Sequence, residues 1–157
     1  MTRYAEGTTV PVDRSRAEIE RILMRYGADQ FAYGYETGGD AMIQFRAHER
    51  LVRLVVPFPD RAAREYTHSA TGLRRSEGSA QSAWEAACRQ RWRALVLVLK
   101  AKLEAVESGI SAFEDEFLAQ TVLPDNTTVA NYMRPQLDRA YERGLMPLAF
   151  PALEAGS

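Results

Sequence analysis

The residues of this chain best suited to chemistry are arginines that gather in its middle third. Residues 61–102 contain nine basic and three acidic side chains, whereas residues 103–157 contain three basic and nine acidic ones. Guanidinium groups bind phosphate and carboxylate oxygens through paired, planar hydrogen bonds. The uneven distribution therefore indicates a surface for a charged partner, although the net charge of the whole chain is only −1.

One predicted helix organises most of this positive charge. Residues 84–109 read WEAACRQRWRALVLVLKAKLEAVESG, with apolar residues at helical spacing. At about 100° per residue, Arg89, Arg93 and Lys100 project into one sector opposite the apolar residues. A basic stripe of this kind is suited to phosphates, which predicts binding of DNA or RNA. The predicted phosphate contacts, including two from the segment before the helix, are Arg74, Arg75, Arg89, Arg93 and Lys100.

Two further basic residues, Arg91 and Lys102, lie at the edge of the apolar face of this helix. Long basic side chains can cover apolar surface with their stems while their charged ends reach water. The acidic last third of the chain offers internal partners for the same groups. A structural role for the basic stripe therefore stands beside the prediction of a binding surface.

Aromatic residues add a second feature that is typical of nucleic-acid binding. The stretch QFAYGYE (30–36) alternates aromatic and small residues, which predicts a strand with Tyr33 and Tyr35 on one face. Tyrosine rings on an open sheet face stack on bases in proteins that bind single strands. We expect Tyr33 and Tyr35 to do so if that face is open.

Three consecutive acidic residues, Glu114, Asp115 and Glu116, give an alternative function. On a helix they spread over about 200°, so they cannot converge on one metal ion. Negative charge near a helix start is favourable in itself. The alternative is a protein-interaction module that inhibits a host factor, in which the acidic last third imitates the charge of nucleic acid.

The sequence gives little support to catalysis, and an enzyme of unknown type is the third possibility. It contains no phosphate-binding loop, zinc-protease motif or nucleophile elbow. Pro59-Asp60 followed by Lys100 and Lys102 resembles a magnesium nuclease site, but Val98 stands where a second carboxylate is needed.

Metal and cofactor binding are not expected either. A single cysteine, Cys88, can form neither an intrachain disulfide nor a thiolate zinc site. The two histidines, His48 and His68, are predicted to be exposed loop residues. We therefore expect no metal, no cofactor and, in the leading prediction, a non-enzymatic binding protein.

The first half of the chain predicts a helix followed by three strands. Ser15 and Glu18 have capping-box spacing, and Gly27 is a suitable helix stop. Strands are then expected over 30–36, 41–45 and 51–58, with a hairpin turn at TGGD. Residues 59–81 lack a stable period and are predicted to be a long basic loop.

The second half predicts helices. Ser82 and Glu85 form a second capping box, opening a helix over 82–108 that Gly109 ends. A third box at Ser111 opens a short helix, and a strand–turn–strand is expected over 122–129. A last helix is predicted to start at Pro135, with its inner face formed by Leu137 and Tyr141.

These elements predict one α+β domain over residues 1–157, in which a three-stranded antiparallel meander packs against a long central helix with additional N- and C-terminal helices. Its predicted irregular parts are an extended lead (1–13), the basic loop (59–81) and a loose tail (145–157). The 82–108 helix could also pair with its own copy, burying Trp84 and Trp92. Without a signal peptide or a long apolar run, the chain is expected in the cytoplasm, with no membrane partner.

Two resemblances bear on these expectations. The order helix, three strands, long loop, helix is similar to double-stranded-RNA-binding domains and to Rad52-like annealing cores, by topology alone. The segments WEAACRQRWRALVLVLKAKLEAVESGI, FEDEFLAQTVLPDNTTV and YMRP resemble a family of hypothetical proteins encoded in bacteriophages and prophages. That resemblance covers nearly the whole chain and implies a bacterial host cell, with an accessory role in replication, recombination or counter-defence.

Overall fold

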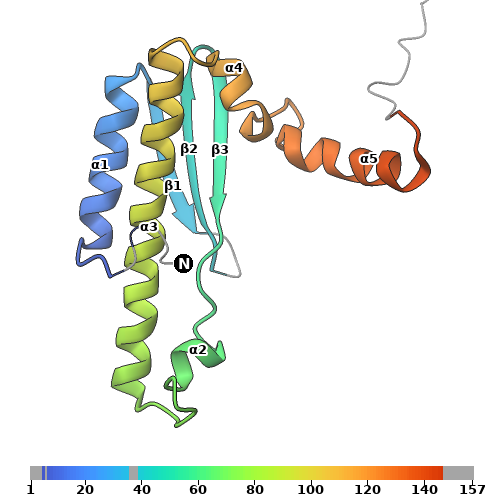
Figure 1. Cartoon of the computed structure of the whole chain (residues 1–157). Coiled ribbons are helices and arrows are strands. Elements are labelled where there is room, and N and C mark those ends of the chain that lie inside the picture. The colour runs from blue at the N-terminus through green and yellow to red at the C-terminus, as the bar shows by residue number, and fades with distance from the viewer. Residues whose placement is uncertain (1–4, 6, 36–38, 147–157) are drawn as a thin grey trace, which may run out of the picture.

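The computed structural model describes residues 5, 7–35 and 39–146. Figure 1 shows the elements, which in chain order are α1 (Val12–Arg25), β1 (Gln30–Tyr35), β2 (Ala41–Ala47), β3 (Arg50–Val56), α2 (Arg64–Thr67), α3 (Glu77–Glu107), α4 (Phe113–Glu116), a 3₁₀ turn η1 (Leu118–Gln120) and α5 (Val129–Arg143). The predicted α+β class, with an antiparallel meander and a long central helix, is confirmed.

The sheet is a meander in the order β1-β2-β3, and both neighbouring pairs are antiparallel. Its residues alternate between two faces, so Ile43 and Phe45 of β2 align with Leu54 and Val52 of β3. This face is buried beneath α1 and α3, which lie side by side over the sheet (Figure 1). Leu99 of α3 is among the side chains that fill the space between the layers.

The β2–β3 turn consists of His48 and Glu49, which both have positive φ, of 49° and 59°. Two-residue hairpins favour this left-handed conformation because it matches the twist of the strands. The ring of His48 stacks on that of Phe113 in α4, with centroids 4.6 Å apart. The turn is thereby tied to the segment that follows α3.

None of the three predicted capping serines is the cap residue of its helix, although the short helix expected after Ser111 is present as α4. α1 begins after Pro11, which leaves Ser15 buried within the helix. α3 is capped by Ser76, whose hydroxyl accepts a hydrogen bond from the Ser79 amide at 3.2 Å. α4 has Ala112 at its cap position, without a side-chain cap. Serine followed by an acid three residues later fits the middle of a helix as well as its start, so the pattern did not identify the boundary.

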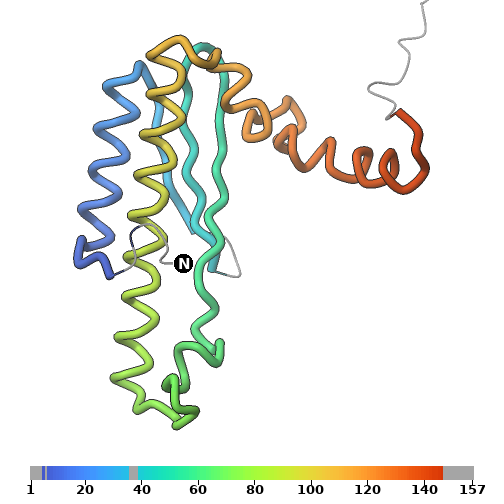
Figure 2. Tube along the Cα trace, viewed as in Figure 1, coloured from blue at the N-terminus to red at the C-terminus, as the bar shows by residue number. Residues whose placement is uncertain are grey.

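The predicted loop over 59–81 is therefore wrong in its last five residues, 77–81, which form the beginning of α3. The rest of the segment contains the single turn α2 and a β-bridge between His68 and Arg74. Figure 2 shows that this first part of α3 continues past the end of the sheet, with α2 and its neighbouring segment beside it.

The last helix also differs from the prediction. α5 begins at Val129, capped by Thr128, and Pro135 lies inside it. None of its fifteen residues is buried, and the side chains predicted to face inward are exposed, Leu137 to 44% and Tyr141 to 88%. α5 projects away from the sheet and helices (Figure 1). Most of the predicted tail, from residue 147, lies outside the described residues.

Over the described residues, the structure contains no helix with enough length and apolar character to cross a membrane. Even α3, with 31 residues, fails this condition because charged side chains are spaced along it.

Two neighbouring positions in α3 test which side of this helix faces the core. Leu99 is fully buried, whereas Val98 is 46% exposed. We expect Leu99→Ala to lower the free energy of unfolding by about 2–5 kcal/mol, because it leaves a cavity between the helices and the sheet. Val98→Ala should change it by less than about 0.5 kcal/mol. Urea unfolding followed by circular dichroism measures both, and equal losses would contradict the packing of α3.

Candidate functional site

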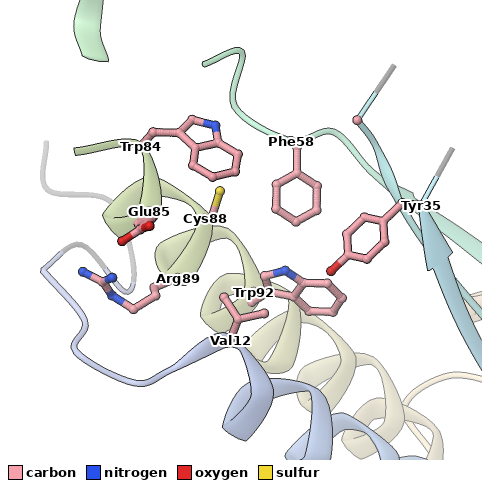
Figure 3. Close-up of a pocket in the computed structure, with 9 residues that line it drawn as sticks. Val12, Tyr35, Phe58, Trp84, Glu85, Cys88, Arg89 and Trp92 are labelled. Atoms are coloured by element: carbon pink, nitrogen blue, oxygen red, sulfur yellow. The ribbon is translucent and has the colours of Figure 1, made fainter. Parts of the chain in front are cut away.

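One candidate site is a pocket of about 600 Å³ where α3 passes the end of the sheet (Figure 3). This volume lies within the range of about 300–1,000 Å³ that is common for ligand sites. One wall is α3, and the others come from the end of β1, the segment after β3 and the start of α1. The lining residues are Val12, Tyr35, Gly39, Phe58, Trp84, Glu85, Cys88, Arg89 and Trp92.

Hydrogen bonds hold the aromatic walls of the pocket in place. The indole N–H of Trp84 donates to the Pro59 carbonyl at 2.8 Å, which ties α3 to the segment after β3. The backbone N–H of Phe58 donates to the Asp40 carboxylate at 3.2 Å. The ring of Phe58 lies 6.0 Å from that of Tyr35 and 6.1 Å from that of Trp92, both tilted. The aromatic surface is thus fixed before any ligand arrives.

The floor of the pocket contains a buried hydrogen-bond donor without an acceptor. Trp92 is 1% exposed, and its indole N–H has no hydrogen-bond partner among the described residues. Its nitrogen edge faces the space between Cys88 and Phe58 (Figure 3). Leaving a buried donor unsatisfied costs about 1–3 kcal/mol. A ligand with an acceptor atom at this position would recover that free energy.

Cys88 supplies apolar lining rather than a nucleophile. Burial raises the pKa of its thiol to about 11, and the neighbouring Glu85 carboxylate acts in the same direction. Because the thiolate is the reactive form, a raised pKa keeps Cys88 neutral and unreactive near pH 7. The pocket therefore offers no thiolate for covalent chemistry.

Charged side chains surround the aromatic surface. Glu85 and Arg89 line the pocket from α3. The guanidinium carbon of Arg61 lies 5.2 Å from the ring centroid of Trp84, and that of Arg16 lies 5.7 Å from Trp92. Cations at this range are attracted to aromatic faces. The pocket thus combines flat apolar walls with positive charge at its edge.

The structure divides the predicted basic residues into two groups. Arg93 forms a bidentate salt bridge with Glu18 of α1, and this hydrogen bonding lowers the pKa of Glu18. Lys102 bonds to both the carbonyl and the carboxylate of Glu116. These two groups link α3 to its neighbours. Among the described residues, those of the 61–102 segment without a salt bridge are Arg61, Arg64, Arg74, Arg75, Arg89, Arg91 and Lys100.

Two of these arginines share a second, more open hollow of about 430 Å³. It lies at α2 and is lined by Arg64 and Arg75 together with His68 and Ser69. The Arg75 guanidinium also donates to the carbonyl of His68 at 3.1 Å, which fixes the base of its side chain beside the hollow. The carboxylate of Glu65 lines the same hollow, which therefore combines two guanidinium groups with one acidic group.

The predicted base-stacking tyrosines lie on β1, whereas the three predicted acidic partner-binding residues lie on α4. Tyr33 and Tyr35 lie on the helix-facing side of β1, where the Arg16 guanidinium stacks on Tyr33 at 4.1 Å and Tyr35 enters the pocket. Glu114 and Asp115 are exposed on α4, whereas Glu116 pairs with Lys102.

Sequence reasoning missed the pocket because Phe58 and Trp84 are 26 positions apart and each resembles an ordinary core residue.

Comparisons of the chain with protein-family models, curated proteins and solved structures find no match. Across residues 5, 7–35 and 39–146, no group of three or more His, Cys, Asp or Glu side chains is placed to hold a metal ion. The candidate site is therefore interpreted from its own geometry.

The thiol of Cys88 gives a direct test of the burial of the pocket floor. A pKa near 11 in place of 9.0 leaves about 100-fold less thiolate at about pH 8. We expect the thiol of the folded protein to react with a disulfide reagent about 100-fold or more slowly than that of the urea-unfolded chain. Comparable rates in the two states would show that Cys88 is accessible and ionised.

The Arg93–Glu18 salt bridge predicts a pH-dependent contribution to stability. Arg93→Ala removes the partner of a mostly buried carboxylate and should lower the free energy of unfolding by about 1–2 kcal/mol at pH 7. Because the pKa of Glu18 is lowered in the fold, the stabilisation is complete above its ordinary value of 4.5 and is lost as the pH falls. Unfolding curves should show that the difference in free energy of unfolding between the unaltered protein and Arg93→Ala is smaller at about pH 3 than at pH 7. The control Arg89→Ala should have little effect at either pH.

Proposed function

We propose that this protein binds nucleic acid, with phosphates contacting the arginines around α2 and the first half of α3. The supporting observation is that arginines without salt bridges among the described residues gather beside an aromatic pocket. Arg61 and Arg89 lie at the pocket, and Arg64 and Arg75 lie at the neighbouring hollow. Basic groups next to exposed aromatic surface are the usual components of single-strand binding.

The geometry revises the residues that carry this proposal. Arg74, Arg75 and Arg89 are kept, and Arg61 and Arg64 are added because they lie at the two hollows. Arg93 is left out because its guanidinium is held by Glu18. Lys100 is exposed on the part of α3 that packs over the sheet, away from the pocket, and its contribution to phosphate binding is expected to be smaller.

The biological setting stays a prediction from the sequence. The resemblance to bacteriophage and prophage proteins suggests an accessory protein in the cytoplasm of a bacterial host, acting in replication, recombination or counter-defence. The proposed activity is binding and includes no catalytic step. A neutral Cys88 in the pocket is consistent with this proposal.

The proposal predicts binding that weakens with salt. Fluorescence polarisation with labelled single- and double-stranded DNA and RNA, at about 50 and 200 mM salt, measures the affinity. For a single strand, the logarithm of the binding constant should fall with the logarithm of salt concentration by about 0.7 for each phosphate contact. Reversing two charges in Arg74→Glu/Arg89→Glu should weaken binding by about tenfold or more and reduce this slope.

A matched control separates local contacts from net charge. Arg134→Glu/Arg139→Glu makes the same change in charge on exposed positions of α5, and its affinity should stay close to that of the unaltered protein. Equal weakening in both double variants would mean that the effect is one of total charge. No binding to any of the four probes would overturn the proposal.

Helix α5, of which no residue is buried by the described part of the chain, favours a second candidate, a protein-interaction role. Its large apolar side chains Tyr132, Leu137 and Tyr141 are exposed, and an isolated helix of about 15 residues is only marginally stable in water. The exposed apolar side chains of α5 support a protein-interaction role more strongly than the acidic residues of α4 do. Trp92 does not contribute to pairing between copies, because it is buried in the core of its own chain.

Sedimentation velocity over about a hundredfold range of concentration tests whether the partner of α5 is a second copy. In that case we expect a dimer whose formation is lost in Leu137→Glu, since a charge would be placed in the apolar contact. A monomer at every concentration would exclude self-association through α5 and direct attention to other proteins.

A further inference from the structure

We propose that the aromatic pocket beside α3 receives one unstacked base of a single strand, whose phosphates lie against Arg61 and Arg89. The proposal rests on the proposed binding of nucleic acid and makes it more specific. It predicts which form of nucleic acid binds, and it gives Trp84, Phe58 and Trp92 the role of holding the base.

The walls of the pocket offer aromatic rings on which a base can stack. Tyr35, Phe58 and Trp84 present flat rings around a space that is closed at the bottom by Trp92 (Figure 3). Hydrogen bonds from Trp84 to Pro59 and from Phe58 to Asp40 fix two of these rings. Stacking on preformed aromatic surface loses little side-chain entropy, and every base has faces that can use it.

The polar groups of the pocket are complementary to the edge of a base. The buried N–H of Trp92 needs an acceptor, and bases carry carbonyl oxygens and ring nitrogens that accept. The carboxylate of Glu85, which accepts a hydrogen bond from the Gln81 side chain at 2.6 Å, also lines the pocket. A purely aliphatic ligand would leave the Trp92 donor unsatisfied, so the pocket favours a flat, polar-edged group.

The charges at the opening explain why the base would belong to a strand. Arg61 lies against the ring of Trp84, and Arg89 lines the same pocket. A phosphate attached to a base held between these rings would meet positive charge at the rim. Arg64 and Arg75 at the second hollow offer a site for a neighbouring phosphate along the backbone.

This arrangement discriminates against duplexes. A base within a duplex is paired and stacked, and removing it from the stack costs free energy that a single strand does not lose. A single strand should therefore bind more tightly than the corresponding duplex. Binding through phosphates alone would not produce this preference, because a duplex carries the denser charge.

Intrinsic fluorescence reports on this pocket directly. The chain contains two tryptophans, Trp84 and Trp92, and both line the pocket. The experiment compares a single-stranded oligonucleotide of about ten thymidines with an abasic deoxyribose-phosphate strand of equal length. We expect the thymidine strand to bind about tenfold or more tightly than the abasic strand and to quench tryptophan fluorescence, which the abasic strand should leave unchanged.

Two variants assign the difference to the pocket. Trp84→Ala should remove most of the difference in affinity between the thymidine and abasic strands, and Trp92 still provides the fluorescence. Tyr141→Ala, an exposed aromatic residue on α5, is the control and should keep the full advantage. Thermal unfolding of each variant shows whether it is folded at the temperature of the titration.

The outcomes separate this inference from the proposed function. Equal, salt-dependent binding of the thymidine and abasic strands without quenching would overturn the base pocket and leave nucleic-acid binding intact. A thymidine advantage that persists in folded Trp84→Ala would also overturn it. The absence of binding by either strand would overturn both.

Discussion

The difference in length between α3 and the sheet is the constraint on which the rest of the structure depends. A helix of 31 residues is about 46 Å long, whereas strands of seven residues extend for about 23 Å. Only the second half of α3, around Leu95, Leu99 and Leu103, can therefore pack over the sheet. The first half must be covered by other parts of the chain, and this cover is incomplete.

The pocket forms where the packing over the sheet ends. Trp92 is the last core residue of α3 at this end of the sheet. Phe58 lies just after the end of β3, and its ring packs 6.1 Å from that of Trp92. Beyond that point the hydrogen bond from Trp84 to the Pro59 carbonyl ties α3 to the segment after β3. Aromatic surface is left exposed there because α2 is a single turn, too short to bury the first half of a long helix.

The same difference in length separates the basic residues of α3 that form salt bridges from those that do not. Where α3 lies against other elements, its basic groups have carboxylates nearby, as Arg93 has Glu18 and Lys102 has Glu116. These partly buried groups link α3 to α1 and α4. Where α3 leaves the sheet, arginines such as Arg89 form no salt bridge among the described residues and can meet a ligand instead.

The sequence predicted much of the fold from local patterns. Alternation around Ile43 and Phe45 marked a half-buried strand, and helical spacing of apolar residues marked α3 up to Gly109, whose positive φ suits a helix stop. Helix starts were less predictable. Ser76 and Ser82 both precede residues that propagate a helix, and capping energies of about 1 kcal/mol do not distinguish them without the tertiary context.

The candidate site was likewise predictable from the sequence only in part. The sequence by itself determined that basic residues concentrate in the middle third, and that α3 carries both these residues and the two tryptophans. It did not determine which arginines are paired, because Arg89 and Arg93 share one side of the helix and differ only in whether Glu18 of α1 lies opposite. Only the tertiary structure brings Tyr35, Phe58 and Trp84 around one pocket. Local periodicity fixes the direction of a side chain within its own element, whereas the partner that it meets depends on how distant elements pack.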